Sequence, residues 1–129
     1  MEKFKNKLQE MKTMIHFASR YGHLEVCTAI LAQVMDKNPK GYEGETPLHE
    51  AAYSGHLLVY KEITQYIENK NPKSNIGLTP LHYAAQEGHL DIRQHIFEHV
   101  EHKILQMKKE IHRFMLLHVM VIGMFVKLL

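Results

Sequence analysis

The chain has 129 residues, of which 45% are apolar, and this is enough to build the core of one domain. Its single cysteine excludes an internal disulfide, and charges throughout positions 1–20 predict no signal peptide, so we expect a cytoplasmic protein. Residues 1–103 hold 12 basic and 13 acidic side chains and residues 104–129 hold four and one, so the basicity is confined to the last segment, which argues against a nucleic-acid-binding surface.

Residues 1–12 are polar and rich in lysine, with Phe4, Leu8 and Met11 at near-helical spacing. This pattern predicts a short helix that caps the segment after it. It is equally compatible with the remnant of an upstream unit of the same kind, and the sequence leaves the two interpretations open.

One motif then occurs three times, beginning at positions 13, 46 and 79, so the interval between copies is constant. Residues 46–57 read TPLHEAAYSGHL, residues 79–90 read TPLHYAAQEGHL, and residues 13–24 carry the weaker copy TMIHFASRYGHL. We call the interval from Thr13 to Thr46, or from Thr46 to Thr79, one period. A fixed period of this length is typical of arrays in which one supersecondary unit is repeated.

Each unit is predicted to be a pair of helices. Threonine before proline favours a helix start, and the motif glycine suits the left-handed residue that ends a short helix. One pair cannot bury its apolar face alone, so we expect the pairs at 13–35, 46–68 and 79–102 to stack, with turns at the Asn-Pro dipeptides between them. The predicted core of the second helices comprises Val59, Ile63 and Ile67, followed by Ile92, Ile96 and Val100.

The period and the motif resemble the ankyrin repeat over residues 13–103. The resemblance implies an all-α solenoid of stacked helix–turn–helix repeats with hairpin-like loops: repeat 1 at 13–45, repeat 2 at 46–78 and a truncated repeat 3 at 79–103. It also implies that the motif threonine and histidine bond each other and the adjoining backbone, while Met14 in place of proline predicts a weaker first helix start. The motif residues with implied structural roles are Thr46, Pro47, Leu48, His49, Gly55, Thr79, Pro80, Leu81, His82 and Gly88.

The resemblance further implies a non-catalytic module without a cofactor, which binds a partner protein on its concave face. Tyrosine and arginine are favoured in such interfaces, although Tyr21, Tyr53 and Tyr83 could instead only pack between repeats. Ile76 and Leu78 are expected at a turn tip, away from the core. The contact positions carried over from the family are Arg20, Tyr21, Tyr42, Glu43, Glu45, Tyr53, Ser54, Asn75, Ile76, Leu78, Gln86 and Glu87.

The repeat pattern stops at Lys103, and residues 104–129 are predicted to form an apolar helical tail. When the last base of each codon is read with the first two bases of the next, the genetic code permits Asn-Pro-Ala-Asp-Glu-Lys-Gly-Asn-Thr-Pro-Phe-His-Ala-Ala-Ala-Cys-Tyr-Gly-His from position 104. The threonine of this string falls at position 112, which is one period after Thr79, and the glycine at position 121 is forced. We therefore hypothesise that the reading frame slips by one base at Lys103, in a run of adenines.

The slip removes the Asn-Pro turn that follows the earlier repeats, and no proline or glycine occurs between Asp91 and Ile122. The last helix is therefore predicted either to run well past His102 or to be followed by a separate helix that folds back. Residues 114–129 include His118 and Lys127 and fall short of the ~20 apolar residues of a membrane span, so we expect weak apolar association and no span.

Two other features are candidates for chemistry. His95, Glu98 and His99 match the HxxEH pattern of zinc hydrolases, but the repeat register places them on an outer helix without a third ligand, so they are interpreted as a solvated face and no metal site is predicted. Cys27 has no partner base and is interpreted as a packed thiol. The main alternative is a non-functional truncated product or a fragment of a larger repeat protein, and a more distant alternative is a metal-binding hydrolase that uses His95, Glu98 and His99.

Overall fold

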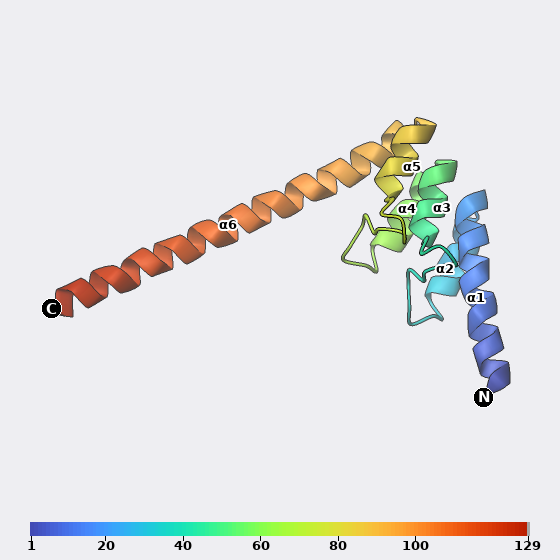
Figure 1. The fold of residues 1–129 in the computed structure, drawn as a ribbon, viewed down its shortest axis with the longest axis horizontal. Helices are drawn as coiled ribbons and strands as arrows, with labels where there is room; N and C mark the ends of the chain where they lie inside the picture. The colour runs from blue at the N-terminus through green and yellow to red at the C-terminus, as the bar shows by residue number, and fades with distance from the viewer. Residues whose placement is uncertain (129) are drawn as a thin grey trace. The chain divides into compact units, whose positions relative to one another are not determined.

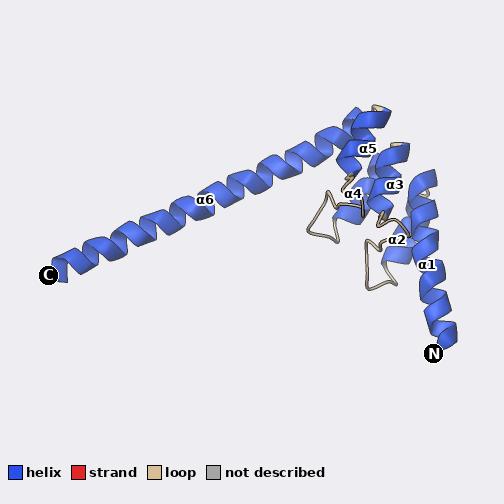
Figure 2. Cartoon of the chain, in the orientation of Figure 1, coloured by secondary structure: helices blue, strands red, loops and turns tan. Residues whose placement is uncertain are grey.

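The computed structural model describes residues 1–128, and every regular element in that part of the chain is an α-helix (Figures 1 and 2). The helices α1, α3 and α5 lie side by side, α1 and α3 contact α2 and α4, respectively, and α2 contacts α4. This is the all-α stack of helix pairs that the repeat period predicts. The helices are α1 (Glu2–Tyr21), α2 (Leu24–Leu31), α3 (Pro47–Ser54), α4 (Leu57–Thr64), α5 (Pro80–Glu87) and α6 (Leu90–Leu128).

The starts of α3 and α5 are held by the same capping interaction. The Thr46 backbone N–H donates to Nδ1 of His49 over 3.0 Å, and the Thr46 and His49 side chains are also within hydrogen-bond distance, at 2.9 Å. Thr79 and His82 repeat both contacts, at 3.0 and 2.8 Å. A proline stands at the first position of each helix, where a missing N–H leaves no bond unmade.

Helix α1 begins at Glu2 and passes through Thr13 without a break. The Thr13 hydroxyl donates to the carbonyl oxygen of Gln9 over 3.0 Å, as an interior helical threonine does, instead of capping a new helix. The weak helix start predicted at this position is therefore wrong. Met14 keeps the backbone N–H that proline lacks, so nothing interrupts the ladder of hydrogen bonds, and residues 1–12 become the first turns of α1.

The core is built from the facing sides of the three helix pairs in the compact unit Met1–Ile96. Cys27 is fully buried with its Sγ 3.8 Å from Oγ of Ser19, and burial raises the pKa of its thiol, as expected for a packed thiol. Val100, predicted as core, is instead 41% exposed. The buried apolar side chains are Ile15, Ala18, Cys27, Ile30, Leu31, Leu48, Ala51, Ala52, Val59, Tyr60, Ile63, Ala84, Ile92 and Ile96.

The two loops between the pairs are short hairpin-like turns. In the first loop the N–H of Gly41 donates to the carbonyl of Glu45 over 2.7 Å, and in the second the N–H of Ser74 donates to the carbonyl of Leu78 over 2.8 Å. The N–H of Asn75 donates to the carbonyl of Glu43 over 3.0 Å, so the backbone joins one loop to the next. This bond fixes the position of the second loop relative to the first.

The glycines that end α3 and α5 have the same backbone conformation but different surroundings. Gly55 has φ 81° and Gly88 has φ 75°, in the left-handed region that side chains with a Cβ rarely adopt. A Cβ on Gly55 would lie 2.5 Å from the ring of His89 in the following repeat, whereas a Cβ on Gly88 would meet no atom of the described chain within 4 Å.

Gly55→Ala is therefore expected to lower the free energy of unfolding by about 2–3 kcal/mol and Gly88→Ala by about 1 kcal/mol. Both substitutions strain the backbone, but only the first displaces His89. Urea unfolding followed by circular dichroism measures both values. Equal losses in the two variants would show that the contact between Gly55 and His89 contributes nothing.

Helix α6 continues to Leu128, which decides between the two alternatives predicted for the tail. Residue 129 lies outside the described residues. Residues 97–128 belong to a second unit, and every side chain from Glu101 to Leu128 is exposed. Among the described residues, one helix, α6, is both long enough and apolar enough to cross a membrane, judged by length and composition alone. Buried helices of soluble proteins pass the same test. The prediction that the apolar tail is too short to span a membrane is nevertheless wrong for α6, which is long enough.

Candidate functional site

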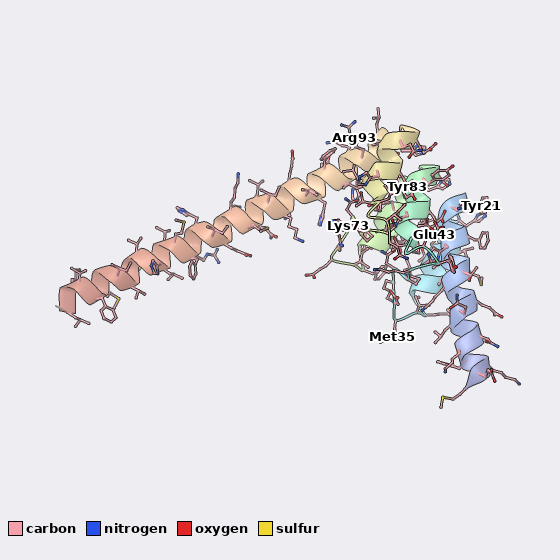
Figure 3. The ribbon with its side chains drawn as sticks, in the orientation of Figure 1. Tyr21, Met35, Glu43, Lys73, Tyr83 and Arg93 are labelled. Atoms are coloured by element: carbon pink, nitrogen blue, oxygen red, sulfur yellow. The ribbon has the colours of Figure 1, made fainter. Side chains whose placement is uncertain are left out.

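The predicted contact residues come from the two loops and from the C-terminal ends of α1, α3 and α5. Arg20 and Tyr21 end α1, while Gln86 and Glu87 end α5, and all four are exposed. Figure 3 labels Tyr21 on α1, Glu43 in the first loop and Tyr83 on α5. We call this surface the loop face: the loops 36–45 and 69–78 with the exposed residues of α1, α3 and α5 beside them.

An ion pair joins two repeats at the centre of the loop face. Nε of Arg20 on α1 donates to Oε2 of Glu50 on α3 over 2.7 Å. The pair borders a hollow of about 150 Å³ that Glu45, Tyr53 and Tyr83 also line. A larger hollow of about 380 Å³ lies between α1 and the first loop, and its lining includes Lys12, His16, Phe17, Lys40 and Tyr42.

The three tyrosines of the helices differ in what they contact. The rings of Tyr53 and Tyr83 meet edge to face with centroids 6.0 Å apart, and Tyr83 also meets the ring of His49 at 5.8 Å. Tyr21 is 61% exposed and stacks on Phe17 of its own helix. Tyr83 therefore packs between repeats, Tyr53 packs while remaining 47% exposed, and Tyr21 contributes little to the stacking of repeats.

The carboxylates at the centre of the loop face repel one another. Burial, together with the neighbouring Glu43, raises the pKa of Glu45. Burial and the charges of Glu45, Glu50 and Glu43 raise the pKa of Tyr83. Arg20 offsets part of this negative charge through its bond to Glu50, which in turn raises the pKa of Arg20. A cation brought to this point by another molecule would be attracted to it.

A family model described as ankyrin repeats in three copies matches residues 15–108. The chain belongs to the ankyrin-repeat family. Ankyrin repeats are generally protein–protein interaction modules, and the family is typically non-catalytic. No curated protein matches the sequence.

The loops of this ankyrin array place two predicted contact residues differently. Ile76 is 78% exposed at the tip of the second loop, in line with its prediction. Leu78, predicted at the same tip, is partly buried, and its carbonyl accepts from Nε2 of His49 over 2.8 Å. Leu78 is therefore held against His49 of its own ankyrin repeat, so its prediction as an exposed tip residue is wrong. Ser54 is also partly buried.

The array also places Lys12 beside the loop face, which the sequence interpretation did not anticipate. Lys12 and Lys40 both line the larger hollow. Lys12 precedes the first copy of the motif, so no family position points to it. Only the continuation of α1 through Thr13 brings Lys12 alongside the first loop.

His95 lies half-buried on α6, and its ring meets that of Tyr60 edge to face with centroids 6.0 Å apart. The interpretation of this histidine as part of a solvated face is therefore wrong. Tyr60 is fully buried, and its hydroxyl donates to the carbonyl of Lys70 over 2.5 Å, so His95 packs on a residue of the core. Within residues 1–128, no three His, Cys, Asp or Glu side chains are grouped closely enough to hold a metal ion.

Proposed function

We propose that this chain is a non-catalytic ankyrin-repeat module that binds another protein through the loop face. The observation that carries the proposal is the set of large side chains exposed there without a role in the core: Tyr21, Tyr42, Tyr53 and Ile76. Aromatic side chains are enriched at the centres of interfaces because they bring a large apolar area at low cost in conformational entropy. Each of the two loops exposes one large side chain, Tyr42 in the first and Ile76 in the second, which favours a partner that spans more than one repeat.

The charges of the loop face favour a partner segment with a lysine or arginine near its middle. Glu43, Glu45 and Glu50 form a group of carboxylates in which Glu45 and Glu50 are partly buried, and burial and Glu43 raise the pKa of Glu45. A cationic side chain close to Glu45 would relieve this repulsion. Such charge pairing contributes to orientation and association rate more than to affinity, so the tyrosines and Ile76 remain the expected energetic centre.

The Tyr53→Ala/Ile76→Ala double variant is expected to lower binding of the partner at least about tenfold. The immobilised wild-type chain captures proteins from an extract, and the captured protein is then titrated against both forms. Leu58→Ala is the matched control, because Leu58 is 67% exposed on α4, away from the loop face. Urea unfolding of each variant verifies that the fold is retained.

A partner that binds all three forms equally would contradict the proposed surface. The competing proposal is that the chain is a non-functional truncated product or a fragment of a larger ankyrin-repeat protein. The fully exposed apolar stretch of α6 supports that competitor, since a continuous apolar surface of this kind is rare in soluble monomers. If the chain is a non-functional product, no captured protein will depend on Tyr53 or Ile76.

A further inference from the structure

Several motif positions that are buried in repeat 2 are exposed or only partly buried in repeat 3. Leu48 and Ala52 are fully buried and His49 is 2% exposed, because repeat 3 covers them. The corresponding residues one period later are partly buried in the case of Leu81 and exposed in the cases of Ala85 and His82. The side of α5 that faces away from α3 therefore carries the residues that form contacts between repeats elsewhere in the array. No repeat of the described chain packs against this side.

The hydrogen bonds from the motif histidine to the last residue of its own repeat follow the same progression. Nε2 of His16 lies 3.1 Å from the carbonyl oxygen of Glu45, and Nε2 of His49 lies 2.8 Å from that of Leu78, one period later. For His82 the corresponding carbonyl would be at position 111. Within the described chain, the ring of His82 bonds only to Thr79.

The glycine that ends the first helix of each repeat shows the same difference. The rings of His56 and His89 fill the space beside Gly22 and Gly55, respectively, so each glycine receives a histidine from the next repeat. Nε2 of His89 also lies 3.0 Å from the carbonyl oxygen of Tyr53. The space beside Gly88 holds no atom of the described chain within 4 Å. A histidine at position 122 would be the equivalent neighbour.

We propose that this side of repeat 3 is the docking surface for a fourth ankyrin repeat, encoded in the reading frame shifted by one base from Lys103. The shifted string places a threonine at position 112, paired alanines at 117 and 118, and a histidine at 122, each one period after its counterpart in repeat 3. The contacts that repeat 3 lacks are those that this string supplies. The docking surface continues the established contacts of α1 with α3 and of α3 with α5.

The course of α6 agrees with the proposal. Helices α2 and α4 have eight residues each and precede loops with an Asn-Pro dipeptide, whereas α6 has 39 residues and no such dipeptide follows it in this frame. The shifted string begins with Asn-Pro at positions 104 and 105. In that frame the second helix of repeat 3 would therefore end before position 104, as its counterparts do.

The test compares the 129-residue chain with the chain encoded after one adenine is added at codon 103. The extended chain is expected to unfold at a temperature roughly 10 °C higher, because repeat arrays gain stability from each added interface. Ala85→Glu is expected to lower that temperature by roughly 10 °C in the extended chain and by less than about 2 °C in the shorter chain. Ala52→Glu is the control: Ala52 is fully buried in the 129-residue chain, and the added repeat would not uncover it, so both chains should lose stability.

Sequencing the genomic DNA across codons 102 to 105 and beyond provides a readout that does not depend on folding, and an open shifted frame with the repeat motif is expected. A shifted frame that lacks the motif would overturn the proposal. So would an extended chain in which Ala85→Glu has no more effect than in the shorter chain. If the shorter chain dimerises, and Ala85→Glu returns it to a monomer, the surface belongs to a second copy instead. None of these readouts involves the loop face, so the proposed function is tested separately.

Discussion

Leu48→Ala is expected to lower the free energy of unfolding by about 3–4 kcal/mol, whereas Leu81→Ala should lower it by about 1–2 kcal/mol. The two leucines occupy the same position in successive copies of the motif. Leu48 is fully buried between repeats, so its loss leaves a cavity that the neighbouring helices cannot fill. Leu81 is partly buried, and the space left by its side chain remains open to water.

Urea unfolding of the two variants, monitored by circular dichroism, gives the difference directly. Leu58→Ala is the matched control, since it removes an exposed leucine from α4 and should change the free energy of unfolding by less than about 0.5 kcal/mol. If Leu81→Ala proved as costly as Leu48→Ala, repeat 3 would have to be covered on its far side in solution. That result would place a further copy or segment against it.

His49→Ala is expected to cost about 2–3 kcal/mol, and His82→Ala about 1 kcal/mol. The His49 ring accepts from the N–H of Thr46 over 3.0 Å and lies 2.8 Å from the carbonyl oxygen of Leu78. Removing the ring leaves the buried N–H of Thr46 without its acceptor, and the Leu78 carbonyl keeps only its bond from the Ser74 N–H, so the loss exceeds that of a bond exposed to water. His82 caps α5 in the same way, but its ring is exposed and bonds no loop carbonyl within the described chain.

The same histidine gives a pH-dependent readout. Because Nδ1 of His49 accepts from Thr46, the network requires the neutral ring with its proton on Nε2. Burial lowers the pKa of His49 below its ordinary value of 6.5, and the bond to the Leu78 carbonyl opposes this in part. A lowered pKa in the folded state means that the contribution of His49 is complete above pH 6.5 and is lost as the pH falls through the folded-state pKa.

The free energies of unfolding of the wild type and His49→Gln, measured from pH 8 to pH 5, should therefore converge as the pH falls below 6.5. Each histidine still present in both proteins contributes equally to the two curves. Parallel curves would show that His49 titrates alike in the folded and unfolded chains, and the proposed neutral role of the ring would be wrong.

The positions that the sequence predicted well depend on neighbours within a few residues. Thr46 and Thr79 start helices because proline follows them and the motif histidine returns to the threonine backbone. Gly55 and Gly88 end helices because a left-handed residue is needed there, whatever lies beyond. At Thr13 no helix starts, and the reason is also local: Met14 has the backbone N–H that proline lacks, so α1 continues through this position.

Other features followed only from the stacking of repeats. Leu78 is partly buried where His49 at the start of its own repeat bonds its carbonyl, and His95 is half-buried because Tyr60 lies against it. The sequence offered no reason to treat Tyr21 and Tyr83 differently, yet only Tyr83 packs between repeats. The sequence by itself therefore determined the period and the starts and ends of α3 and α5, which local hydrogen bonds set. The tertiary structure decided which copy of each motif residue is buried, because burial depends on a neighbouring repeat that the residue's own sequence does not contain.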